Sequence, residues 1–388
     1  MEKTKVKQLF TDHHNHVSTN IVGKDSATVA ACKNIDEAYE LINSLNPNRL
    51  YNVLAWQWPN CDISRIDKNI PIIISHYSLH DYHMNKKGSE ELFKKSTNPI
   101  KEGFIHNVYI KKDPIWIEKN LAEIFSMLNG LYVFNIKGIN EWFCELEKNY
   151  GIYSTEDMLT PSEDFIEKVN ISAYAGRCKF WVGFSDYKQW GQNVKERIEG
   201  IKIFIDGGMG VKTAAVKNGY QSPLQGYKNG LLIYTDEELG NALKEVEESG
   251  LNLSMHCIGD HGIEQILNVI ETKNIDIPLI RIEHAQFITK EQAIKCKKMA
   301  IVLCMQPNFS YDTTADIPLR NEIMNPEVLK NNNPFRMLID EVGYKPGLDL
   351  IFGSDGMPQG IPEGYANDES LYHPMRLTEE ELLSGYAL

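Results

Sequence analysis

The 388-residue chain lacks several features that mark common classes of protein. Its seven cysteines are scattered, odd in number and without a Cys-x-x-Cys pair, which is typical of reduced thiols, several of them core residues. No apolar stretch approaches the length of a membrane-spanning helix, and residues 1–5 carry no apolar run of a signal peptide. We therefore expect a soluble, cytoplasmic protein.

Long basic runs are also missing, and the formal net charge is -13. This balance argues against nucleic acid or an anionic membrane surface as the main partner. No Gly-x-Gly-x-x-Gly opens a helix after the first strand, which weakens a dinucleotide-binding interpretation. Internal repeats and low-complexity segments are absent as well.

What the chain does contain is an alternation of apolar strands and amphipathic helices. Strands that are apolar throughout indicate a parallel sheet covered on both faces. Counting from Phe10, about eight such strands are each followed by a helix or a long connecting segment. This count favours an α/β fold of the TIM (β/α)8 barrel type over an open doubly wound sheet. The expected strands are 6–10, 50–55, 71–75, 131–134, 180–184, 200–205, 251–256, 279–284, 300–305 and 349–355.

A His-x-His pair, His14 and His16, follows the first expected strand. Side chains alternate along an extended chain, so these two imidazoles lie on the same side of the backbone, where they can bind a divalent metal. Alone the pair is a weak signal, because packing or surface histidines are more common. Its value depends on ligands from elsewhere in the chain.

Other strands end in residues that bind metals or move protons. In a barrel the carboxyl ends of the strands converge on one rim, so residues distant in sequence can share one centre. Each has an ordinary alternative: a core histidine, a turn aspartate, or a lysine that finds an anionic partner because a buried bare ammonium is costly. These residues are Lys202, His256, His284 and Asp355.

Together these motifs resemble those of the amidohydrolase superfamily of metal-dependent hydrolases. Their residue sequences are similar to those of the type-3 branch, which includes N-substituted formamide deformylase. The resemblance runs from about residue 8 to the end and is strongest over residues 200–358. The segments that carry it are His14-Asn15-His16, Gly200–Gly207, His256–Asp260, Arg281–Gln286, Met305-Gln306-Pro307 and Gly353–Gly356.

The resemblance implies a barrel that holds one or two divalent ions, most often zinc. His14 and His16 would bind one ion, His256 and His284 the second, and Lys202 would be carboxylated so that its carbamate bridges both. Asp355 would contact the first ion and act as the proton shuttle for a metal-activated hydroxide that cleaves a C–N bond of an amide, formamide or cyclic amide. Glu283 and Asp260 are candidates, by position only, for orienting the ligands.

The resemblance also implies a small-molecule substrate and suggests which residues contact it. His80 and Asn85 match a family histidine and asparagine near the substrate pocket. His80 is expected to contact the substrate or transition state, and the less favoured alternative is a loop histidine without a role. Asp206 and Gly207 match as well and would shape the turn beside the metals. Trp56 and Trp58 are candidates for the pocket wall, though aromatic side chains after a strand are as often packing residues.

Departures from the family pattern concern the ends and the pocket. Relatives carry segments before the His-x-His and after the last helix that pair as a β-sandwich, whereas here the pair begins at residue 14. We therefore expect a single barrel domain over residues 1–388 without the sandwich, either a trimmed form or a truncated product, with a less regular insertion at about 86–130 forming part of a lid. Uncovered barrel surface would favour a homo-oligomer. Gly262 stands where relatives usually have alanine. Because this pocket motif is altered, the sequence does not identify the substrate.

Two alternatives remain at this stage. A barrel of the same superfamily could carry out decarboxylation, isomerisation or ester hydrolysis on the same metals. The chain could also be an inactive barrel that serves as a binding partner, although the intact set of six candidate ligands argues against this.

Overall fold

The computed structural model describes residues 9–58, 60–190, 192–313 and 323–388. Eight strands form one parallel sheet in the order β1-β5-β6-β7-β8-β9-β10-β11. The two edge strands approach each other, because Asp355 N beyond β11 donates to His14 O of β1 at 2.7 Å. The sheet is therefore a nearly closed barrel, as the alternation of strands and helices predicts. Its strands are β1 (Phe10–Asn15), β5 (Ile152–Asp157), β6 (Cys178–Gly183), β7 (Gly200–Phe204), β8 (Asn252–Cys257), β9 (Ile280–His284), β10 (Val302–Met305) and β11 (Leu350–Phe352).

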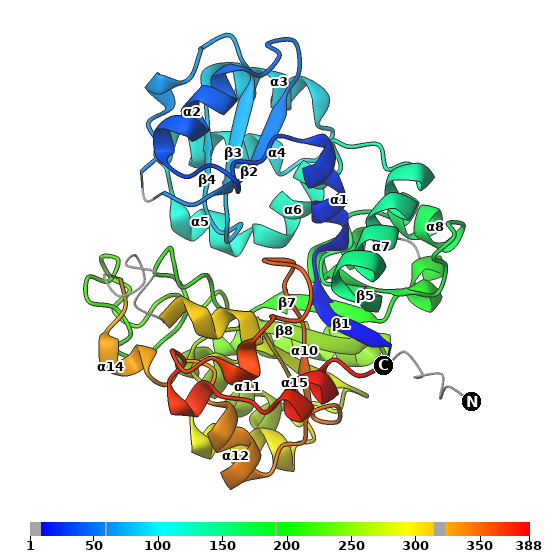
Figure 1. Ribbon diagram of the computed structural model, residues 1–388, viewed down its shortest axis with the longest axis vertical. Helices are drawn as coiled ribbons and strands as arrows, with labels where there is room; N and C mark the ends of the chain where they lie inside the picture. The colour runs from blue at the N-terminus through cyan, green and yellow to red at the C-terminus, as the bar shows by residue number, and fades with distance from the viewer. Residues whose placement is uncertain (1–8, 59, 191, 314–322) are drawn as a thin grey trace.

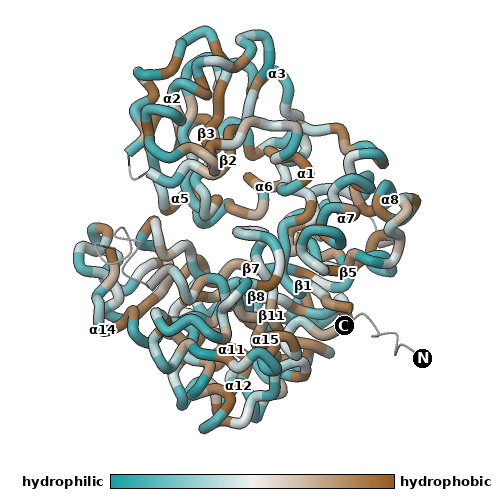
Figure 2. Tube along the Cα trace, in the orientation of Figure 1, coloured by the Kyte–Doolittle hydropathy of each residue, from teal (hydrophilic) through white to brown (hydrophobic). Residues whose placement is uncertain are grey.

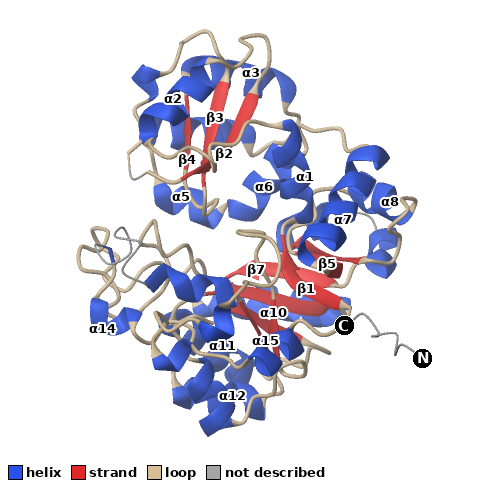
Figure 3. Ribbon diagram, viewed as in Figure 1, coloured by secondary structure: helices blue, strands red, loops and turns tan. Residues whose placement is uncertain are grey.

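Helices lie between the strands and cover the outside of the barrel (Figures 1 and 3). The Thr235 and Thr289 side chains cap α10 and α12 in capping boxes, whose sequences are Thr-x-x-Glu and Thr-x-x-Gln. One buried cluster joins the β7–β11 strands to α10, α11 and α12. The helices outside the insert defined below are α1 (Val17–Asp25), α7 (Ile136–Tyr150), α8 (Glu163–Asn170), α9 (Phe184–Gln189), α10 (Asp236–Ser249), α11 (Asp260–Lys273), α12 (Lys290–Lys298), α14 (Pro326–Leu329) and α15 (Glu379–Gly385).

Residues 26–130, which we call the insert, separate the first barrel strand from the second. They hold a three-stranded sheet of order β2-β3-β4, in which β2 and β3 are parallel and β4 is antiparallel to β3. Ile73 faces one apolar cluster while Ile72 and Ile74 face another, so helices cover both sides of this sheet. Figure 1 shows the insert, blue to cyan, standing on one end of the barrel, and in Figure 2 β2 and β3 are mostly brown. Its elements are α2 (Ile35–Asn43), β2 (Tyr51–Trp56), β3 (Ile72–His76), β4 (Tyr82–Met84), α3 (Lys86–Lys95), α4 (Lys101–Phe104), α5 (Pro114–Lys119) and α6 (Leu121–Asn129).

Several strand predictions need correction. Residues 50–55 and 71–75 lie in strands, but in the sheet of the insert rather than in the barrel. Residues 131–134 are not a strand; they form the connection between α6 and α7. The first strand begins at Phe10, so the His-x-His pair lies at its end, while residues 6–8 of the expected strand lie outside the described part of the chain.

The missing barrel strand is β5, Ile152-Tyr-Ser-Thr-Glu-Asp, which contains too few apolar residues to satisfy the pattern. Glu156 on β5 is buried and pairs with the Arg281 guanidinium at 2.6 Å, so a charged side chain occupies an interior position. Among the described residues the strands form only the two sheets, and no β-sandwich accompanies them. In the same part of the chain, no helix is long and apolar enough to cross a membrane.

Candidate metal centre

The six predicted metal ligands line one small cavity of about 30 Å³ at the carboxyl end of the barrel. They lie on β1, β7, β8 and β9 or just after β1 and β11. The parallel sheet thus brings together side chains that are more than 300 residues apart, such as His14 and Asp355. The residues are His14, His16, Lys202, His256, His284 and Asp355.

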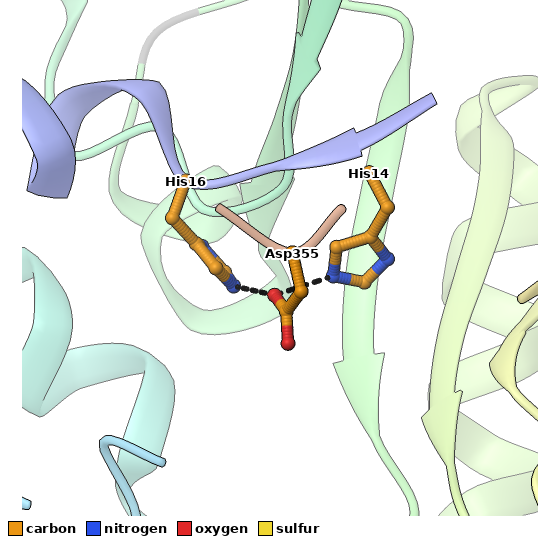
Figure 4. A group of neighbouring side chains, drawn as sticks. All are labelled: His14, His16 and Asp355. Atoms are coloured by element: carbon orange, nitrogen blue, oxygen red, sulfur yellow. Dashed lines mark ion pairs between the residues drawn. The ribbon is translucent and has the colours of Figure 1, made fainter. Parts of the chain in front are cut away.

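Asp355 lies between His14 of β1 and His16, which directly follows β1 (Figure 4). Its Oδ1 is 3.2 Å from His14 Nε2 and 3.0 Å from His16 Nε2. The three ligand atoms lie close enough to share one ion. Asp355 has φ 58° and His284 has φ 71°, left-handed conformations that cost about 1–3 kcal/mol each and persist where the surroundings enforce them.

The second pair of histidines adjoins the first. The ring centroids of His256 and His284 are 4.5 Å apart, and those of His14 and His284 are 4.9 Å apart. Burial lowers the pKa of His284 to about 3 and holds that of His256 well below its usual value. Both imidazoles are therefore neutral near pH 7, the form whose nitrogen lone pair binds a metal.

Lys202 lies among these side chains, 1% exposed, and its Nζ has no hydrogen-bond partner among the described residues. Burial lowers its pKa to about 8, because desolvation outweighs the carboxylates of Glu283 and Asp355. His16 Nδ1 and His284 Nδ1 are likewise buried without a partner in the described chain. Imidazoles and a carboxylate surrounding an unpaired lysine are a donor set that fits a divalent metal.

Buried partners hold the first histidine in place. Glu283 Oε2 is 2.6 Å from His14 Nδ1, and Glu283 Oε1 accepts from Ser254 Oγ at 2.8 Å and from Arg281 Nε at 2.9 Å. A carboxylate behind a ligating histidine orients the ring and fixes its tautomer. His13, excluded by strand alternation, contacts Glu156 Oε1 at 3.0 Å instead. Asp260 lies outside this group, where its Oδ1 accepts from Lys217 N.

His80 also lines the metal cavity, and it is held by a residue that sequence reasoning missed. Its Nδ1 is 2.7 Å from Oε2 of Glu118 on α5, a carboxylate that is 1% exposed and also binds Thr213. Burial lowers the pKa of His80, but Glu118 outweighs it and the net shift is upward. The available signal was a single glutamate on an apolar helix, Ile115-Trp116-Ile117-Glu118, within a stretch that otherwise reads as an irregular lysine-rich insertion.

Comparison with known proteins identifies the family. Residues 10–370 match the amidohydrolase family, which is nearly the whole chain. The chain belongs to the amidohydrolase family.

Two curated relatives match parts of this chain. It is 29% identical over 229 residues to the putative amidohydrolase YtcJ of Bacillus subtilis (strain 168), a match that covers 56% of this chain and 40% of YtcJ. It is 33% identical over 117 residues to the Protein LONG AFTER FAR-RED 3 of Arabidopsis thaliana, covering 29% of this chain and 20% of that protein. The matches thus span less than half the length of these relatives.

Solved structures support the fold. An uncharacterized metal-dependent hydrolase from Pyrococcus horikoshii OT3 superposes with a TM-score of 0.66 at 19% identity, covering 98% of this chain and 77% of that one. An uncharacterized metal-dependent hydrolase from Pyrococcus furiosus gives a TM-score of 0.64 at 17% identity, covering 98% of this chain and 80% of that one. At such identities the likeness shows the barrel architecture alone.

Asp206 and Gly207 lie beside the metal cavity, in the turn after β7. Asp206 is buried and accepts hydrogen bonds from three backbone N–H groups, those of Ala215, Ile258 and Gly259, while burial raises its pKa to about 7. Gly207 O is 3.3 Å from His256 Nε2. A Cβ on Gly207 would lie 2.3 Å from Thr213 Oγ1, so only glycine fits there. Both residues therefore shape the turn that lies beside His256 of β8.

Asn85 and the two tryptophans lie away from the cavity. Asn85 caps α3, accepting from Gly88 N at 2.7 Å and donating to Ile70 O at 2.7 Å. These contacts occupy its amide group, so a substrate contact by Asn85 stays a prediction that the contacts do not favour. Trp56 and Trp58 pack on each other in an apolar cluster of the insert, with ring centroids 5.0 Å apart.

Proposed function

We propose that the chain is a metal-dependent hydrolase that cleaves a C–N bond of an amide, formamide or cyclic amide. The observation that carries the proposal is the convergence of two histidine pairs and Asp355 around the buried, unpartnered Nζ of Lys202. A structural core would not leave a lysine amine without a partner among neutral imidazoles. Family membership agrees with this chemistry, and zinc is the metal that we propose.

The donors divide into two groups that share Lys202. His14, His16 and Asp355 would hold one ion, and His256 and His284 would hold the other. Lys202 is suited to carboxylation, because an amine with a pKa of about 8 is partly neutral near pH 7 and can attack carbon dioxide, losing a proton to form a carbamate. When bound, the ions lower the pKa of a water molecule and polarise the carbonyl of the substrate.

Proton transfer would fall to Asp355. Burial raises its pKa, but His14 and His16 outweigh this and hold it well below the usual value, so the carboxylate is ionised and able to accept a proton. The same carboxyl group would then donate that proton to the departing nitrogen. His80, held at Nδ1 by Glu118, would contact the substrate oxygen through Nε2.

The remaining expectations also stand as proposals. The chain would act as one barrel domain, with residues 86–130 of the insert forming part of a lid. A cytoplasmic location and a homo-oligomeric state remain predictions from the sequence.

Metal content and turnover together test the function. Protein purified without chelator is expected to contain zinc or another divalent ion, and addition of zinc or manganese to stripped protein should restore hydrolysis within a panel of amides, formamides and cyclic ureas. Absence of metal and no turnover after metal addition would contradict the proposal and favour an inactive barrel. Metal binding with turnover confined to esters or to decarboxylation would favour the second enzyme class.

A further inference from the structure

A second cavity, of about 810 Å³, opens from the metal cavity toward the insert. The two cavities share four lining residues, His16, Leu79, Asp355 and Met357. A neck formed by Leu79 and Met357 therefore connects them beside the candidate ligands. Leu79 has φ 60°, an unusual conformation for a bulky side chain, which marks the neck as a position that the fold enforces.

One face of α1 forms a wall of this outer cavity. His16, Thr19, Asn20, Gly23 and Lys24 line it, and their spacing is that of a single helical face. The wall runs from the ligand His16 to Lys24, a distance of about 12 Å at the rise of an α-helix. The outer cavity is thus elongated and leads away from the reacting centre.

Most of the other lining groups are apolar or already bonded within the protein. Leu54, Trp142, Leu146 and Pro358 are among the apolar ones. Of the polar ones, Thr19 Oγ1 accepts from Asn129, and Asn20 Nδ2 donates to Asn15 Oδ1. A pocket of this size and lining favours an apolar ligand.

Charge in the outer cavity is balanced. Apart from His16 and Asp355 of the metal site, the described charged residues that line it are Lys24 and Glu145, which form an ion pair. Their side chains are 40% and 55% exposed, so the pair lies at the far end from the metals. Glu145 thereby neutralises the Lys24 ammonium, which would otherwise attract an acidic group on a ligand.

We propose that the outer cavity selects an uncharged amide with one elongated, largely apolar arm that lies along α1, and that Glu145 excludes substrates whose arm ends in a carboxylate. The inference rests on the proposed C–N hydrolase function and names the substrate class of that site. Gly23 sets the length of the arm, because a Cβ there would lie 3.0 Å from Leu54 Cδ1 and any larger side chain would enter the cavity.

Matched amides test the charge selectivity. N-Methyloctanamide and N-heptylacetamide place a neutral arm on either side of the amide bond, and the mono-N-methylamide of suberic acid adds a terminal carboxylate. Binding is measured by calorimetry with and without zinc, and amine release is measured in parallel. The better neutral amide is expected to bind about tenfold more tightly than the acid. Glu145→Gln removes the partner of Lys24, whose ammonium can then bind the carboxylate of the acid. The ratio of neutral-amide affinity to acid affinity should therefore fall about fivefold.

Chain length is tested with Gly23→Leu. In the unmodified protein each added methylene of the arm should raise affinity by about fourfold until the cavity is filled, and Gly23→Leu should end this gain at a shorter arm. Lys137→Leu, which places the same side chain on the exposed face of α7, is the matched control and should keep the full gain.

The outcomes separate this inference from the proposed function. Equal or tighter binding of the acid, a ratio that Glu145→Gln leaves unchanged, or no binding of either neutral amide would overturn the inference. Selective binding without amine release from metal-loaded protein would contradict the hydrolase and leave the selectivity standing. Amine release without a preference for the neutral amide would support the hydrolase and overturn the selectivity.

Discussion

The barrel strands and the insert contribute to the site in different ways. The barrel supplies all six candidate ligands from the carboxyl ends of its strands, whereas the insert supplies His80, Glu118 and the apolar wall that includes Leu54 and Leu79. The barrel thus carries the chemistry, and the insert shapes the space in which a substrate would lie. Barrels of this kind vary their loops while the strand ends stay in place, which lets one chemistry serve many substrates.

The largest expected effect is on the barrel side, from Asp355→Asn. Loss of the proton acceptor should lower kcat by about 10²–10⁴-fold. Initial rates on any amide that the protein hydrolyses would measure this, with metal content determined on the same sample. Asp340→Asn, on an exposed part of the chain, is the control. A kcat within twofold of the parent would contradict the role of Asp355 as proton shuttle.

The next effect concerns the ion pairs inside the barrel. Arg281 binds Glu156 Oε2 at 2.6 Å and Glu283 Oε1 at 2.9 Å, and all three side chains are buried. Arg281→Met leaves two buried carboxylates without their cation and should lower the free energy of unfolding by about 3–5 kcal/mol. Denaturant unfolding would measure the loss. Arg65→Met, which removes an exposed pair with Asp36, should cost less than about 1 kcal/mol.

The same network predicts a dependence of stability on pH. Burial raises the pKa of Glu156, but Arg281 and then His13 outweigh it and lower the pKa to about 2. A folded-state pKa below the unfolded value of about 4.3 stabilises the protein above pH 4.3, and this contribution is lost as the pH falls toward 2. Unfolding curves across this range should show a smaller loss for Glu156→Gln than for the parent protein.

A pair of core substitutions compares the two regions directly. Ile74→Ala in β3 and Leu253→Ala in β8 each remove a fully buried side chain and should each cost about 2–5 kcal/mol. Because the ligands come from the barrel, Leu253→Ala should also reduce metal content, whereas Ile74→Ala should leave it unchanged. Thermal unfolding and metal analysis would measure both. Equal metal loss in the two variants would show that the insert and the barrel do not contribute separately.

The smallest effect comes from Glu118→Gln in the insert. The amide keeps a hydrogen-bonding group at His80 but removes the charge, so kcat/KM should fall by about tenfold, or about 1.4 kcal/mol, at unchanged metal content. Glu102→Gln, at an exposed position of α4, is the matched control. Activity equal to that of the control would remove His80 and Glu118 from the mechanism.

Local pattern was enough to predict the strand-end residues of the barrel. Strands β7 and β10 are mostly apolar, and in β8 and β9 apolar residues alternate with polar ones. Each potential ligand stands in or directly after such a strand, so His256 and His284 could be placed from periodicity and topology. Strand β5 could not be found in this way, because Glu156 and Ser154 face partners on other strands and break the apolar pattern. The strand expected at 131–134 was wrong for the opposite reason, since four mostly apolar residues can pack in a loop between helices.

The sequence by itself determined the alternation of strands and helices, the barrel, and the residues able to bind metal, because these depend on side-chain period and on the chemistry of single residues. Only the tertiary structure decided which strands close the barrel, that β2 and β3 belong to the insert, and that Glu118 reaches His80. It also decided that Lys24 is paired with Glu145 across 121 residues of chain. The physical reason is that such pairings join distant segments through space, where no local period records them.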